Sequence, residues 1–187
     1  MASIQMHNLA LINNYYMVKL EVWQRGPLAD LESLLQPVGH AILQAQEELH
    51  EYLNDFPDQL LWIKPAGMAS VGFHLQHLSG VLDRVFTYAR SEGLTSFQFE
   101  QLEEEGKDSE NGYSVRALID RFDFQVTVAM KQLRETDINT LTEFKGIGRA
   151  GLPSTVMGLL FHGAEHTMRH LGQLMVTAAV VKENYTN

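Results

Sequence analysis

The chain has 187 residues, of which 14 are basic and 23 acidic, so its formal net charge is −9. This length is typical of one domain with its own hydrophobic core. The acidic balance argues against a nucleic-acid partner, because phosphate binding needs clustered lysine and arginine. The absence of cysteine excludes disulfides, thiolate nucleophiles and cysteine metal ligands. It fits a reducing compartment, so we expect a cytoplasmic protein. No apolar stretch approaches the roughly 18 residues of a membrane span, and no membrane association is expected.

Residues 1–27 show no periodic pattern and are interpreted as an N-terminal extension. The remaining residues, 28–187, are expected to form one domain. Its first helix is predicted at about 30–55, because apolar residues recur there at steps of three and four. These residues are Leu31, Leu35, Val38, Ile42, Ala45, Leu49 and Leu53.

The second helix is predicted at about 70–92, with Ser70 as its N-cap and Gly93 as its C-cap. A polar and acidic connection follows over residues 94–112, with room for a short helix. Its run of three glutamates, 103–105, is expected to be a solvated face.

The third helix is predicted from Ser114 to about Glu135, followed by a glycine-containing loop. Pro153 and Ser154 are expected to begin the fourth helix, because proline suits the first turn of a helix. That helix is predicted to reach about residue 181. Four amphipathic helices without strand-like alternation predict an all-α four-helix bundle, in up-down-up-down order.

The histidines are concentrated on the second and fourth predicted helices. His166 and His170 are four residues apart, so both imidazoles face one side of the fourth helix and can reach one ion. A third histidine from a facing helix would leave a position open for water or substrate, as in catalytic zinc sites. On a helical wheel His74 lies nearer the apolar stripe than His77, so periodicity favours His74 as the third ligand. His162 lies at the margin of the fourth helix's inner face.

Three strings in the chain resemble the DinB-like (DinB/YfiT-like) superfamily of metal-dependent enzymes. Residues 62–71 (WIKPAGMASV) resemble the tryptophan, proline and serine that precede the family's second helix. His77-Leu78 resembles the His-Leu that follows this serine by seven residues. Residues 166–173 (HTMRHLGQ) resemble the family's paired histidines followed by x-Gly-Gln. Leu171 stands where the family often has arginine, so no role of that arginine is carried over.

The resemblance implies a four-helix bundle, often a homodimer, with one divalent metal held by three histidines. Carried over by position, the ligands are His77, His166 and His170. This choice departs from the wheel, because the spacing from Ser70 selects His77. The remaining nearby polar residues then become pocket residues or partners of the ligands: His74, His162 and Gln173.

A divalent transition metal on three neutral imidazoles keeps its full charge and can activate water or a thiol. We expect zinc first and nickel second. The resemblance supports a hydrolase or a thiol S-transferase acting on a small-molecule substrate. Thiol chemistry needs an external low-molecular-weight thiol, because the chain has no cysteine. The alternative is a non-catalytic, metal-stabilised bundle serving as a stress-associated binding or scaffold protein, with His74 or His162 as a fourth ligand.

Four other polar or aromatic residues near these motifs are interpreted as structural. Glu165 is expected in a surface ion pair, and Asp83 with Arg84 in a salt bridge of the bundle. Trp62 is expected to pack the loop before the second helix onto the bundle.

Overall fold

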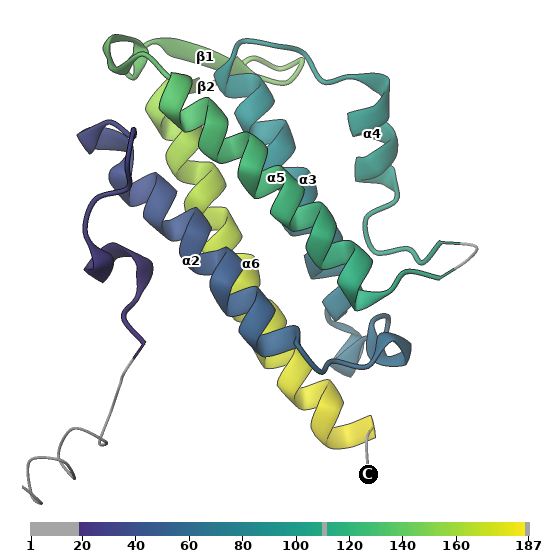
Figure 1. Cartoon of the computed structure of the whole chain (residues 1–187). Coiled ribbons are helices and arrows are strands. Elements are labelled where there is room, and N and C mark those ends of the chain that lie inside the picture. Colours follow the sequence, from purple (N-terminus) through teal and green to yellow (C-terminus); the bar gives the residue numbers. More distant parts are fainter. Residues whose placement is uncertain (1–18, 110–111, 186–187) are drawn as a thin grey trace, which may run out of the picture.

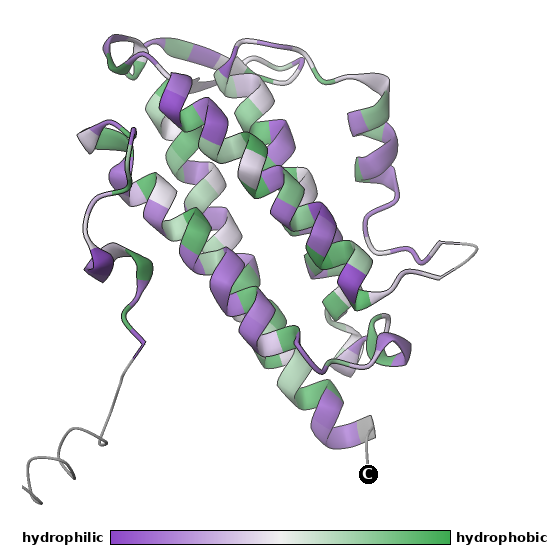
Figure 2. Ribbon diagram, in the orientation of Figure 1, coloured by the Kyte–Doolittle hydropathy of each residue, from purple (hydrophilic) through white to green (hydrophobic). Residues whose placement is uncertain are grey.

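The computed structural model describes residues 19–109 and 112–185 and confirms the predicted four-helix bundle (Figure 1). The long helices are α2 (Gln36–Leu53), α3 (Val71–Ala89), α5 (Val115–Glu135) and α6 (Val156–Tyr185). Figure 2 shows polar and apolar residues alternating along these helices, as expected of amphipathic helices packed around one core. Five short 3₁₀ turns lie in the described segments: η1 (Val22–Arg25), η2 (Ser33–Leu35), η3 (Asp58–Leu60), η4 (Pro65–Gly67) and η5 (Ile138–Thr140).

The predicted apolar stripes form the core. On α2 every stripe residue from Leu35 to Leu53 is buried, and on α5 the stripe residues are buried from Leu118 to Leu133. Two serines begin helices as predicted: Ser70 Oγ accepts a hydrogen bond from the backbone N–H of Phe73, and Ser114 caps α5 in the same way. The two serines therefore mark in the sequence where α3 and α5 begin.

The order of helix directions differs from the predicted up-down-up-down. α3 and α5 run in the same direction, opposite to α2 and α6 (Figure 1). At the start of both helices, Val115 N–H donates to Asp58 Oδ1 in the loop that leads into α3. At their ends, Gln132 donates to the backbone oxygen of Phe86. The physical reason is the long connection after α3, which returns along the bundle through α4 (Ser96–Glu103) before α5 begins.

Several predicted helix ends are wrong. α2 begins at Gln36, after the turn η2, rather than near residue 30. α3 ends at Ala89 with Arg90 as its C-cap, before Gly93. Pro153 and Ser154 belong to a strand, and α6 begins at Val156. The strands β1 (Phe144–Ile147) and β2 (Leu152–Thr155) form an antiparallel hairpin, in which Phe144 pairs with Thr155. The hairpin was missed because each strand has only four residues, too few for a clear alternating pattern.

The part of the predicted N-terminal extension that the structure describes, residues 19–27, lies against α2. Val22 is buried, and Arg25 forms an ion pair with Glu47 on α2. Residues 1–18 of that extension lie outside the described residues. Within the described residues, none of the helices combines the length and the apolar character needed to cross a membrane.

Candidate metal centre

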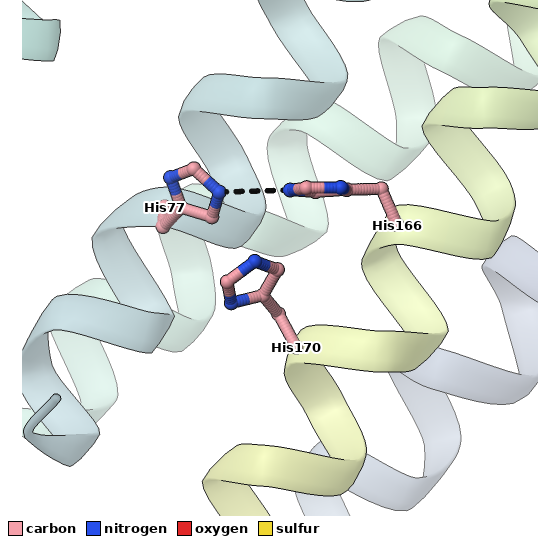
Figure 3. A group of neighbouring side chains, drawn as sticks. All are labelled: His77, His166 and His170. Carbon is pink, nitrogen blue, oxygen red and sulfur yellow. Dashed lines mark hydrogen bonds between the residues drawn. The ribbon is translucent and has the colours of Figure 1, made fainter. Parts of the chain in front are cut away.

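Three histidines converge between α3 and α6. His77 comes from α3, and His166 and His170 come from successive turns of α6 (Figure 3). One ring nitrogen from each lies within 4.8 Å of the other two. The Nε2 atoms of His77 and His166 are 3.0 Å apart. The structure thus brings together the three residues that the resemblance indicates.

Two of these imidazoles, those of His166 and His170, lie where the neutral form is favoured. Burial, followed by the neighbouring His77, lowers the pKa of His166 below its ordinary value. Burial and the same neighbour lower the pKa of His170 to about 4. Near neutral pH such rings carry a lone pair on one nitrogen, which is the form that binds a metal.

His77 is held by a carboxylate from the connection after α4. Its Nδ1 lies 2.7 Å from Oε2 of Glu105, whose Oε1 lies 2.7 Å from Nη2 of Arg84. Burial alone would raise the pKa of the Glu105 carboxyl, but the hydrogen bond with His77 and the charge of Arg84 outweigh it and hold this pKa below its usual value. An ionised carboxylate can only accept, so Nδ1 of His77 carries a hydrogen, and Nε2 is the nitrogen that faces His166.

The positions of Glu105 and Arg84 correct two expectations. Glu103 and Glu104 are exposed as predicted, but the side chain of Glu105 is only 6% exposed. Arg84 pairs with Glu105 rather than Asp83, which accepts a hydrogen bond from Gln98 in α4. Sequence reasoning missed Glu105 because no spacing rule connects a glutamate in a long connection to a histidine 28 residues earlier.

His74, which periodicity favoured as the third ligand, lies behind the group. It is 3% exposed, and its Nδ1 lies 3.1 Å from Nδ1 of His170. Burial and then the nearby His77 lower the pKa of His74 to about 4. Since Nδ1 of His170 faces His74, Nε2 of His170 is the nitrogen left for the group in Figure 3.

His162 lies one turn before His166 and is exposed. Its Nδ1 is 2.7 Å from Glu165, which also pairs with Arg169, so the expected surface ion pair of Glu165 is present. His162, Glu165 and His166 form a second, more exposed group that shares His166 with the first.

An open groove of about 780 Å³ reaches the site along α6. Its lining includes His74 and His170 on one side, and Gln173 lies exposed in its wall rather than buried in the core. The other lining residues are mostly apolar and include Met68 and Val176. A second groove of about 720 Å³ lies against the hairpin, at the other end of α3, and contains none of the histidines.

The loop before α3 is fixed as predicted, because Trp62 packs on the core and covers Gly72.

The donor set fits one divalent transition metal. Bonds of about 2.0–2.1 Å at tetrahedral angles separate two imidazole nitrogens by about 3.3 Å, close to the 3.0 Å between His77 and His166. The Nδ1 atom of His166 is buried without a hydrogen-bond partner, so this ring is not fully satisfied by the protein alone. The three imidazoles suit zinc, nickel, copper or iron by ligand type.

Comparisons with known proteins show the family and the fold of this chain. The family model described as the DinB superfamily matches residues 41–174. A solved structure, a conserved protein from Enterococcus faecalis, is 16% identical, with a TM-score of 0.66 over 82% of this chain and 99% of that one. At this identity the likeness concerns the fold. A search of curated proteins gave no match.

Proposed function

Because the chain belongs to the DinB superfamily, we propose that His77, His166 and His170 hold one divalent metal and that the protein is a metal-dependent enzyme. The observation that carries this proposal is the convergence of three imidazole nitrogens within 4.8 Å, from two helices of the bundle. Two such histidines on one helix turn are common, but a third ring from a facing helix is not expected without a shared ligand.

A bound ion would supply Lewis acidity, which lowers the pKa of a water or thiol beside it. The chain's own residues supply the positioning. Glu105 keeps the hydrogen of His77 on Nδ1, and His74 faces Nδ1 of His170, so both rings direct Nε2 toward the centre. The reaction class is hydrolysis or transfer of an external low-molecular-weight thiol to a small-molecule substrate. The apolar groove beside His170 supports a substrate with an apolar part.

The groove also favours an enzyme over the alternative of a closed, metal-stabilised scaffold. A scaffold site needs a fourth protein ligand. In the described structure neither His74 nor His162 belongs to the group of three whose nitrogens lie within 4.8 Å of one another. The groove meets the site at His170, where solvent or substrate has access.

Three further features of the proposal have different grounds. Zinc is proposed as the first metal and nickel as the second because the ligands are imidazoles. A cytoplasmic location is proposed from the absence of cysteine, and a homodimer from the family resemblance. Sizing chromatography tests the dimer directly, since a monomeric elution volume contradicts it.

The central experiment measures metal per chain on protein purified without a metal-affinity tag. Wild type is compared with His166→Ala and with His40→Ala, a histidine on α2 away from the group. We expect about one equivalent in wild type and in the control variant, and loss of the metal in His166→Ala. Failure of wild type to bind zinc or nickel after reconstitution would refute the proposal. With metal bound, hydrolase and thiol-transfer screens separate the two reaction classes.

A further inference from the structure

A buried ion pair lies directly behind His77. Arg84 and Glu105 are joined at 2.7 Å, and their side chains are only 10% and 6% exposed. Glu105 uses its other oxygen for Nδ1 of His77, also at 2.7 Å. The carboxylate is therefore held from both sides, although Nη1 of Arg84 is buried without a hydrogen-bond partner.

The backbone around Glu105 is fixed to α3 by one amide side chain. Gln76, which is 2% exposed, accepts from the N–H of Gly106 at 2.7 Å and donates to the backbone oxygen of Lys107 at 3.0 Å. Gly106 has a positive φ of 85° and approaches Phe73 closely. The connection after α4 is therefore held against α3 at the level where Glu105 meets His77.

A glycine on α3 makes space for the ion pair. A Cβ atom at Gly80 would lie 2.5 Å from Nη1 of Arg84 and 2.5 Å from Oε1 of Glu105. Only a residue without a side chain lets the pair lie across the helix. The flat face of the His77 ring stacks on the ring of Phe73, and the two ring centroids are 5.3 Å apart.

The three imidazoles differ in what lies behind them. His77 has an anionic partner, His170 faces the imidazole of His74, and Nδ1 of His166 has no partner. A carboxylate that accepts from a ligand histidine fixes its tautomer and makes its other nitrogen more basic. His77 is thus the one ring of the group whose orientation is fixed by a carboxylate.

We propose that Glu105, held by Arg84 in the space left by Gly80, is the positioning residue of this centre and directs Nε2 of His77 toward the metal. This inference rests on the proposed metal site. Loss of such a partner weakens metal binding about 10- to 100-fold in comparable sites.

The test compares Glu105→Ala, Glu105→Gln and a matched control, Glu104→Gln, whose side chain is exposed and pairs with Lys107. The first readout needs no metal: nitrogen NMR of the His77 ring reports which nitrogen carries the hydrogen. We expect Nδ1–H in wild type and in Glu104→Gln. In Glu105→Gln the amide oxygen should stay with Arg84, which can only donate, so the NH2 group faces Nδ1 of His77 and favours the Nε2–H form. Glu105→Ala should lose the preference for Nδ1–H.

The second readout is the zinc dissociation constant, measured by competition with a chromogenic chelator. Glu105→Ala should bind zinc about 10- to 100-fold more weakly than wild type, with Glu105→Gln between them and Glu104→Gln unchanged. Wild-type affinity and wild-type tautomer in Glu105→Ala would overturn the proposal while leaving the metal site intact. If wild type itself binds no metal, the proposed function fails, and the tautomer measurement still decides whether Glu105 positions His77.

Gly80→Ala keeps every polar group and improves helix propensity, so it serves if the Glu105 variants fail to fold. Its added methyl group should displace the ion pair and weaken zinc binding about tenfold. Unchanged zinc affinity in this variant would contradict the role assigned to the pair.

Discussion

Replacement of His74 by leucine should remove part of the protein's sensitivity to acid. His74 is 3% exposed, and its pKa is lowered to about 4 in the folded chain, from 6.5 for a free histidine. In the unfolded chain the ring takes up a proton at higher pH than in the folded chain. The stability that depends on a neutral His74 is therefore complete above pH 6.5 and is lost as the pH falls toward 4.

The size of the effect follows from this difference. One proton taken up only by the unfolded state changes the free energy of unfolding by about 1.4 kcal/mol per pH unit. Over the whole window from pH 6.5 to 4 this amounts to about 3 kcal/mol, and at pH 5 to about 2 kcal/mol. At pH 8, His74→Leu should differ from wild type by only about 1 kcal/mol, because it loses one hydrogen bond to His170 and gains apolar burial.

Urea unfolding of both proteins in the presence of EDTA, at intervals between pH 8 and pH 4.5, measures this effect. The expected result is a wild-type stability that falls more steeply than that of His74→Leu, so that the variant is the more stable protein near pH 5. Parallel curves for the two proteins would refute the reasoning, since they would mean that His74 takes up its proton equally in both states.

Three further changes test the packing and the site. Ser70→Ala should destabilise the protein by about 1 kcal/mol in thermal unfolding, because α3 loses its N-cap. Gly72→Ala should lower the free energy of unfolding by about 1–3 kcal/mol, because the new Cβ would lie 2.6 Å from the indole of Trp62. Gly93→Ala is the control and should change this free energy little, because the space around Gly93 is open. Zinc at 100 times its dissociation constant should stabilise the protein by about 2.7 kcal/mol, reversibly with EDTA, and a similar shift in His166→Ala would contradict the ligand assignment.

The sequence was sufficient to predict the helices, because each carries a continuous apolar stripe and two begin at a serine cap. The stripe from Leu118 to Leu133 and the cap at Ser114 place α5 almost to the residue. Helix direction was not predictable in the same way. It depends on how the connection through α4 packs, and that packing uses polar contacts between distant residues such as Asp83 and Gln98.

The candidate site was predictable in part. The i, i+4 spacing of His166 and His170 indicates a shared face by helical geometry alone. Periodicity favoured His74 over His77, because the stripe marks burial and the site lies at the edge of the core, where His77 is partly exposed. Glu105 left no local signal, since it meets His77 only after the connection folds back and Gln76 fixes it.

The spacing of the histidines along the chain has a consequence for the order of folding. His77 and His166 are 89 residues apart, so an ion bound between α3 and α6 would close a long loop. A permanent cross-link around a loop of roughly this length removes unfolded-state entropy worth on the order of 4–5 kcal/mol. A partly folded chain with α2 and α3 alone presents a single imidazole of the three and has little means to capture metal. The centre can form only after α6 has docked, so metal uptake would report completion of the bundle rather than start it.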